Sequence, residues 1–401
     1  MPPQQTIAGP IALPGARADE WRYGNLALHS VAHFFIDLYS SALSAFQPIL
    51  VQTMGITLTQ AGFLGGALSF SSSVMQPAYG YLSDRYHTKL FTALAPAVAG
   101  IFISAVGMAP SYPWLILMVI LGGAGIASFH PQGSARATLG IEHNRTRWMA
   151  VFISSGTLGL ALGPTYFSWL VTRLGMSGAW WGAVPGVLIT LLLLIYLHEP
   201  ARTEHHHAAL DWSPLKACWQ PLAILYALVF IRSILQVTYS QFLPLYLNHE
   251  RGFTLAESSL GLTLYLASGA LGGFLGGNLA ERFGGRRVIL ASMLLCVPCL
   301  ALFFWATTPW IAFTGLALGG LTLLFTIPVN LTMAQALAPA HTGTISALMM
   351  GFAWGAAGIL FVPLAGFVAE RTSLHLALSA LLVFPLLGAW LTPQLRRYGC
   401  D

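Results

Sequence analysis

The chain has 401 residues, of which 56% are hydrophobic and only 8% are charged, and its formal net charge is +5. Soluble domains carry charge on roughly a quarter of their residues, so this composition excludes an ordinary soluble protein. About twelve apolar stretches of roughly 20 residues follow one another, each long enough to cross a bilayer as a helix. We therefore predict an all-α integral membrane protein with about twelve transmembrane helices.

The predicted elements form two groups of six. Residues 1–24 lack a basic start followed by an apolar run, so we expect a cytoplasmic tail and no cleavable signal peptide. The predicted spans of the first half, 25–198, are 25–51, 58–82, 89–109, 112–137, 147–172 and 178–198. A polar segment with three adjacent histidines, 199–218, is predicted to be a cytoplasmic linker. The predicted spans of the second half, 219–395, are 219–248, 255–280, 287–307, 309–337, 342–369 and 374–393.

Basic residues are distributed unevenly between the loops. Counted from a cytoplasmic N-terminus, nearly all Lys and Arg fall on one side, and only Arg173, Arg251 and Arg371 fall on the other. This asymmetry predicts that both termini lie in the cytoplasm. Because the basic residues are sorted by loop and do not form one surface patch, nucleic acid is not an expected partner.

Two segments that lie 197 residues apart, 80–85 and 277–282, share the pattern Gly-x-Leu-(Ser/Ala)-(Asp/Glu)-Arg. The same spacing separates Pro131 from Pro328. A repeat of almost half the chain length indicates a duplicated structure. Because duplicated halves of membrane proteins place a binding site where they meet, transport is the favoured function.

The two six-span halves, the central loop and the doubled loop motif resemble the major facilitator superfamily. The resemblance implies alternating access, with spans one, four, seven and ten lining a central cavity. The run Gly159-x-x-x-Gly163-Pro164 in span five is similar to the antiporter motif of that superfamily.

A narrower resemblance rests on spans one and four. The two segments concerned are His29-x-x-x-His33-Phe34-x-x-Asp37 and Phe129-His130-Pro131. They are similar to the fosmidomycin-resistance branch, a group of bacterial drug exporters. That branch commonly has an acidic residue after the His-Pro pair, where this chain has Gln132. The resemblance implies efflux, drug resistance and a location in the bacterial cytoplasmic (inner) membrane.

Asp37 is the only acidic residue well inside a predicted span. His29 and His33 precede it at four-residue intervals, so the three side chains lie along one face of a helix. A charged group at membrane depth is costly unless it is paired or faces water, so this face is expected to line a cavity. Because burial and charge can move the pKa of His and Asp into the physiological range, we predict a proton path through His29, His33 and Asp37. Buried histidines bonded to neighbouring backbone groups are the alternative.

Arg232 is the only basic residue near a span centre. Gln236 and Tyr239 follow it on the same helical face, and such donors suit a carboxylate, phosphate or phosphonate. With His130 of span four and Asn330 of span ten, these residues form the predicted substrate site. A purely structural pair between Asp37 and Arg232 is the alternative.

The doubled loop motif is predicted to act as a conformational gate. Its acidic residues stand beside basic ones at helix ends, where opposite charges can hold neighbouring helices in one state. The superfamily resemblance implies that this loop stabilises an outward-facing state. The residues assigned to the gate are Gly80, Asp84, Arg85, Lys89, Gly277, Glu281, Arg282 and Arg286.

The combined interpretation is a proton-coupled exporter (antiporter) of small drug-like or anionic compounds. An uptake symporter for a small organic anion fits the same features. A membrane enzyme is not expected, because we find no nucleophile with an adjacent base. A metal site on His29, His33 and Asp37 and a transporter-like sensor are weaker hypotheses. We expect no cofactor and no metal, a monomer, and partners limited to substrate, protons and lipid.

Overall fold

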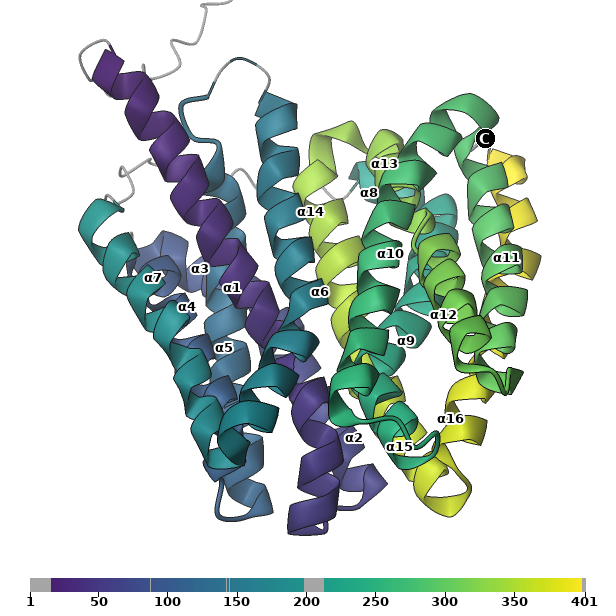
Figure 1. The fold of residues 1–401 in the computed structure, drawn as a ribbon. Coiled ribbons are helices and arrows are strands. Elements are labelled where there is room, and N and C mark those ends of the chain that lie inside the picture. Colours follow the sequence, from purple (N-terminus) through teal and green to yellow (C-terminus); the bar gives the residue numbers. More distant parts are fainter. Residues whose placement is uncertain (1–15, 87, 142, 144, 198–212, 399–401) are drawn as a thin grey trace, which may run out of the picture.

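The computed structural model describes residues 16–86, 88–141, 143, 145–197 and 213–398. Every regular element within these ranges is helical. Figure 1 shows two bundles side by side, the first built from the N-terminal part of the chain and the second from the C-terminal part. The predicted division into two halves is therefore visible in the arrangement of the helices. Residues 1–15, most of the predicted linker and its three histidines lie outside the described residues.

The first bundle crosses the molecule six times. One crossing is interrupted by a π-helical turn, η1, and another continues into a short 3₁₀ turn, η2. Its elements are α1 (Ala16–Met54), α2 (Leu58–Ser69), η1 (Phe70–Val74), α3 (Gln76–Tyr86), α4 (Leu90–Ser104), η2 (Ala105–Met108), α5 (Tyr112–Ala137), α6 (Arg145–Gly178), η3 (Ala179–Gly182) and α7 (Ala183–Tyr196).

The second bundle repeats this arrangement. A short helix, α8, precedes it, and its fifth crossing again contains a π-helical turn, η5. Its elements are α8 (Ser213–Ala217), α9 (Trp219–His249), α10 (Leu255–Phe283), α11 (Gly285–Trp305), α12 (Pro309–Leu323), α13 (Thr326–Leu337), η4 (Pro339–His341), α14 (Thr342–Ser346), η5 (Ala347–Phe352), α15 (Ala353–Arg371), α16 (Leu374–Ala380), α17 (Val383–Leu391) and η6 (Thr392–Tyr398).

In the described part of the chain, ten segments are long and apolar enough to cross a membrane. One of them, Arg147–Tyr196, contains two crossings, because Gly175 leaves the helical conformation with φ 75°. The interrupted crossing from α2 to α3 is not among the ten. These two adjustments reconcile the ten segments with the twelve predicted spans. One boundary differs, since α1 begins at Ala16 and makes residues 16–24 of the predicted tail helical.

The duplication is visible in how equivalent helices begin. Gly55 and Gly252 turn the chain with φ of 63° and 72°, a conformation that glycine adopts without steric cost. Thr57 and Thr254 then cap α2 and α10, each in a reciprocal capping box with the residue three positions later. The repeated Gly-x-Thr-Leu sequence therefore builds the same turn-and-cap in both halves.

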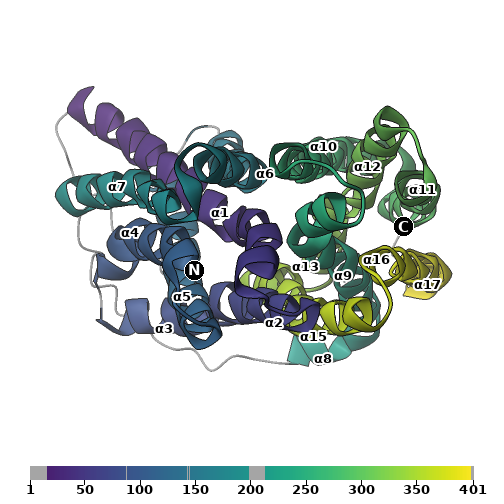
Figure 2. The ribbon, with the colours of Figure 1, turned by 60° about the horizontal axis from the view of Figure 1, so that its bottom comes forward.

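The two bundles pack along glycine-rich helices. Figures 1 and 2 both show α2 beside α15 and α6 beside α10. A Cβ atom on Gly62 would lie 2.8 Å from the carbonyl oxygen of Val362, so the α2 and α15 backbones approach closely. Between α6 and α10, the hydroxyl oxygens of Thr165 and Thr263 are 2.6 Å apart. Close packing of this kind is typical of helix pairs in membranes.

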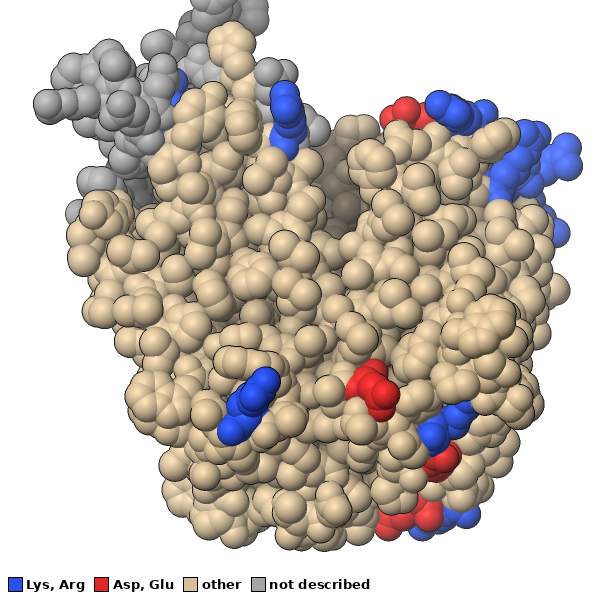
Figure 3. All heavy atoms as spheres, viewed as in Figure 1, with Lys and Arg blue, Asp and Glu red and all other residues tan. Residues whose placement is uncertain are grey.

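The two ends of the molecule differ in charge and in packing between the halves. We call the end that carries Arg85, Arg145, Arg286 and Arg396 the basic end. At the opposite end, Glu370 of α15 accepts a hydrogen bond of 3.0 Å from the backbone N–H of Thr59 in α2, which ties the halves together. At the basic end, Figure 3 shows a recess between the halves. The structure is thus closed at one end and hollowed between the halves at the other.

Candidate functional site: an imidazole–carboxylate cluster in the first half

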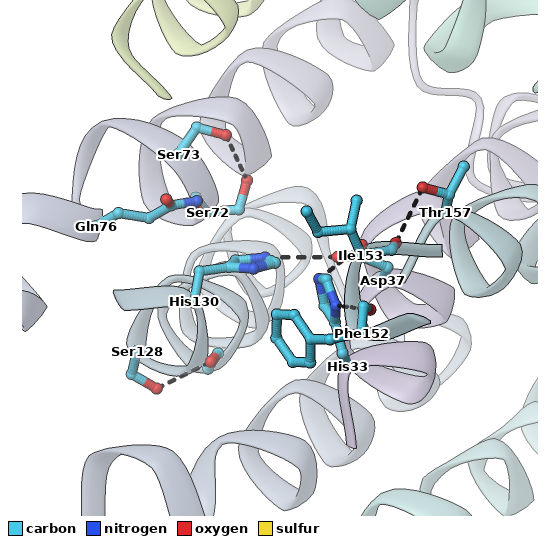
Figure 4. Close-up of polar contacts among 11 residues, drawn as sticks. His33, Asp37, Ser72, Ser73, Gln76, Ser128, His130, Phe152, Ile153 and Thr157 are labelled. Atoms are coloured by element: carbon cyan, nitrogen blue, oxygen red, sulfur yellow. Dashed lines mark hydrogen bonds and ion pairs between the residues drawn. The ribbon is translucent and has the colours of Figure 1, made fainter. Parts of the chain in front are cut away.

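Asp37 lies in the middle of α1 and interacts with two histidines. Its Oδ2 is 3.3 Å from Nε2 of His33, one turn earlier on the same helix. Its Oδ1 is 3.4 Å from Nε2 of His130, which α5 supplies. The carboxylate therefore lies between two imidazoles, one facing each oxygen, as Figure 4 shows. One ligand atom each from His33, Asp37 and His130 lies within 4.8 Å of the others, so this group, with His130 in place of His29, has the spacing of a possible metal site.

Phe152 fixes the orientation of the His33 ring. Its Nδ1 is 2.9 Å from the carbonyl oxygen of Phe152 in α6. A carbonyl only accepts hydrogen bonds, so Nδ1 carries a proton and donates it. The Phe152 ring also stacks on the imidazole, with centroids 4.3 Å apart. With Nδ1 occupied in this way, Nε2 is the ring nitrogen that faces Asp37.

The nature of the contact between His33 and Asp37 depends on protonation. A bare Nε2 lone pair and an ionised carboxylate are both acceptors, and two acceptors at 3.3 Å repel each other. One proton between them, on His33 or on Asp37, converts the contact into a hydrogen bond. The observed geometry therefore suits a cluster that holds a proton.

Helix α6 reaches this cluster through a glycine. A Cβ atom on Gly156 would overlap the His33 ring and Oδ2 of Asp37. Farther along α6, Gly159 packs on the backbone of Phe34 and Gly163 on that of Leu38. Because these glycines have no side chain, α6 packs closely against α1 inside the first half. The sequence motif contains Gly159 and Gly163. It does not reveal that Phe152 and Gly156 contact the pair of His33 and Asp37.

The cluster remains accessible to solvent. The side chain of Asp37 is 17% exposed and that of His130 is 24% exposed, against 10% for His33. Figure 4 shows the His130 ring pointing toward Asp37. Water or a small ligand can therefore approach the carboxylate from the His130 side.

His29 lies one turn from His33 but outside the cluster. It is fully buried, and its Nδ1 donates a hydrogen bond of 2.8 Å to the carbonyl oxygen of Asn25. Its Nε2 is buried without a hydrogen-bond partner in the described part of the structure. Within the described residues, His29 is not hydrogen-bonded to His33 or Asp37.

Arg232 lies on α9 in the second half and is 4% exposed. Its Nη1 donates a hydrogen bond to Oε1 of Gln236, and its Cζ lies 5.8 Å from the centre of the Trp354 ring. Its Nε is buried without a hydrogen-bond partner among the described residues. The ion pairs found for Asp37 within the described ranges are with His33 and His130, so the structure does not show a direct pair with Arg232.

Tyr239 and Asn330 of the predicted substrate site also lie inside the second half. Tyr239 is fully buried and donates a hydrogen bond of 3.1 Å to the carbonyl oxygen of Leu378. Asn330 on α13 is fully buried, and neither atom of its amide has a partner within the described part. The structure thus separates His130, which joins Asp37, from the residues around Arg232.

The predicted gate of the first half has mixed contacts. Arg85 donates from Nη1 to the hydroxyl of Tyr81 at 3.2 Å. Lys89 donates to the carbonyl oxygens of Leu194 and Leu197 at 2.8 and 2.7 Å, so it caps the last turn of α7. The side chain of Asp84 lies outside the described part of the structure. Gly80 packs closely on Pro131 of α5.

The predicted gate of the second half is exposed. Glu281 and Arg282 stand in the last turn of α10, and within the described residues they form no ion pair. Gly277 of the same helix faces Pro328, the counterpart of the contact between Gly80 and Pro131. Arg286 lies in the first turn of α11. The duplicated glycine–proline contacts therefore place both loops at equivalent positions of the basic end.

Comparison with known families agrees with this architecture. The model of the Major Facilitator Superfamily matches residues 30–361 and 225–397, which together cover nearly the whole chain. The chain belongs to the Major Facilitator Superfamily. The all-helical two-half fold and the family predicted from the loop motifs are thereby confirmed.

Two bacterial relatives span almost the full length of this superfamily member. YfnC of Bacillus subtilis, described as an uncharacterized MFS-type transporter, is 30% identical over 93% of each chain. The fosmidomycin resistance protein of Escherichia coli is 27% identical, over 94% of this chain and 95% of its own. Among solved structures, a bacterial homolog of the human lysosomal transporter Spinster, inward-facing and occupied, superposes with a TM-score of 0.81 at 15% identity, over 94% of this chain and 97% of that one. The last likeness shows the fold alone.

Proposed function

We propose that this superfamily member is a proton-coupled antiporter that exports small anionic or drug-like compounds by alternating access. The fosmidomycin resistance protein is similar along almost the whole chain, which supports a role in efflux. The positive-inside asymmetry supports a bacterial cytoplasmic membrane with the basic end in the cytoplasm. In that orientation the recess seen in Figure 3 faces the cytoplasm.

The observation that carries the proposal is the placement of Asp37 between two imidazoles. The carboxylate is 3.3 Å from His33 and 3.4 Å from His130, and it remains partly exposed. A lone ionised carboxylate at membrane depth is costly, and a bound proton removes much of that cost. Gain and loss of this proton therefore change which conformation of the halves is favourable.

The cycle follows from this change of charge. In the cytoplasm-facing state, water enters from the His130 side and takes the proton from the cluster. The negative charge left on Asp37 then opposes closure of the halves around an empty site. When the anion has bound, closure of the halves carries it outward. On the far side the cluster takes up a proton before the halves return. Protons and substrate thus move in opposite directions.

The substrate group is proposed to bind at Arg232. The guanidinium is buried in the second half, and Gln236 is its observed hydrogen-bond partner. The unpartnered Nε and the unpartnered amide of Asn330 leave donors available inside this half. A carboxylate or phosphonate can take up such donors, and charge-assisted bonds of this kind are roughly twice as strong as neutral ones.

Transport in proteoliposomes tests the role of Asp37. With fosmidomycin as the probe, an imposed pH gradient is expected to drive flux by the wild-type protein and not by Asp37→Asn. Exchange of labelled for unlabelled fosmidomycin without a gradient is expected to persist in the variant, because exchange needs no net proton movement. The matched control is Asp211→Asn in the linker, which removes the same charge outside the predicted spans. Gradient-driven flux that survives Asp37→Asn would refute the proposal.

A further inference from the structure

A basic cavity lies at the basic end of the second half, away from the imidazole–carboxylate cluster. Its volume is about 440 Å³, and it is lined by Phe283, Gly284, Arg286, Arg287 and Arg396. The arginines come from the first turn of α11 and from η6 at the end of the chain. Figure 3 shows Lys and Arg atoms gathered at the upper right of the molecule, above α11. Three arginines therefore line one cavity.

The backbone adds positive potential at the same place. Helix α11 begins at Gly285, and its N-cap residue, Gly284, has φ 88° and offers no side-chain hydrogen bond. The first N–H groups of a helix lack partners within the helix, and the helix dipole makes this end positive. The arginines and the start of α11 thus both favour a negatively charged ligand.

Comparison of the two halves shows that this charge is not a general feature of the repeat. The residues 197 positions before the three arginines are Lys89, Leu90 and Glu199. Those positions have a formal charge of zero in the first half and +3 in the second. In the first half Lys89 is bonded to the carbonyl oxygens of Leu194 and Leu197 and caps α7. The second half has therefore gained charge around the cavity.

We propose that this cavity binds the phosphate group of an anionic phospholipid. Planar guanidinium groups match phosphate oxygens in paired hydrogen bonds, and basic pockets at the cytoplasmic surface suit anionic head groups. Phe283 lines the same cavity and is 57% exposed. Its apolar ring therefore lies beside the arginines, where the acyl chains of a phospholipid join the head group. Free phosphate shares the charge but makes no use of this ring.

Native mass spectrometry of the full-length protein in neutral detergent tests the proposal. Phosphatidylglycerol and phosphatidylcholine are the two lipid probes. The pocket variant combines Arg286→Gln, Arg287→Gln and Arg396→Gln. Its control combines Arg145→Gln, Arg147→Gln and Lys216→Gln, which removes the same charge elsewhere at the basic end. Because each basic residue near an anionic membrane surface contributes about 1 kcal/mol, we expect phosphatidylglycerol affinity to fall about fivefold per arginine in the pocket variant.

Two further measurements identify the ligand and control for misfolding of the triple variant. Inorganic phosphate in excess is expected to bind much more weakly than phosphatidylglycerol, and Arg396→Gln alone, at the end of the chain, is expected to weaken lipid binding about fivefold in a folded protein. Equal losses in the pocket and control variants would overturn the proposal. Equal affinity for the two lipids, or phosphate binding as tight as that of phosphatidylglycerol, would overturn it as well.

Discussion

At the scale of single residues, hydrogen bonds to the backbone determine which side-chain atoms remain available for other contacts. His33 uses Nδ1 for the Phe152 carbonyl, so only Nε2 is left to share a proton with Asp37. Gly156 has no side chain, so α6 can pack directly against this pair. The first half thus holds an acid and two histidines, and the second half holds the buried Arg232. The duplicated fold carries two different kinds of chemistry in its two halves.

Arg232→Gln is expected to weaken fosmidomycin binding by roughly 10- to 150-fold, because a hydrogen bond to a charged group contributes about 1.5–3 kcal/mol. Arg232→Lys is expected to lose less affinity for fosmidomycin than Arg232→Gln, since lysine keeps the positive charge but lacks the planar guanidinium group. Thermal-shift titrations with fosmidomycin measure both effects. Arg173→Gln, an exposed arginine at the opposite end, is the charge-matched control. Unchanged binding by Arg232→Gln would rule out this arginine as the anion site.

At the scale of elements, the contact between α2 and α15 closes the end opposite to the basic end. A Cβ atom on Gly366 would overlap the carbonyl of Leu58 across the two halves. Glu370 bonds the start of α2 on the same seam. Near the middle of the molecule the π-helical turns η1 and η5 also meet, and Gly355 packs on Val74 there. These contacts must separate when the opposite end opens.

Gly366→Val is expected to favour the conformation in which this seam is open. Overpacking a close contact costs about 1–3 kcal/mol, which corresponds to a population shift of roughly 5- to 150-fold. Electron paramagnetic resonance distances between spin labels on Thr53→Cys and Thr372→Cys, at the seam end of the two halves, measure the change. Gly273→Val in α10, which meets only an ordinary contact with Leu324, is the control. Identical distance distributions for the two glycine variants would contradict the role of the seam.

Much of the architecture can be predicted from the sequence because apolar length and the 197-residue repeat are local, countable signals. The membrane spans and the two halves follow from them. The start of α1 does not, because residues 16–24 are polar enough to resemble a tail. Three-dimensional neighbours are less accessible: the sequence groups His130 with Arg232, whereas packing of α5 on α1 places it beside Asp37. A backbone acceptor such as the Phe152 carbonyl leaves no trace in residue type.

At the scale of the whole molecule, the two halves are joined at one end and separated by a recess at the other. In the proposed transport cycle, this asymmetry gives the imidazole–carboxylate cluster access to one side at a time. The cluster and Arg232 lie in different halves, so rearrangement of the halves changes the surroundings of both. Coupling in this account arises because protonation and substrate binding each favour one arrangement.

The sign of proton movement tests the central claim most directly. Proteoliposomes loaded with fosmidomycin and a trapped pH-sensitive dye are diluted into substrate-free medium, and the internal pH is recorded while fosmidomycin leaves. The account predicts internal acidification with the wild-type protein, because protons enter as the anion exits, and no pH change with Asp37→Asn. Fosmidomycin efflux from wild-type vesicles with internal alkalinisation, or with no pH change, would contradict proton antiport through this cluster.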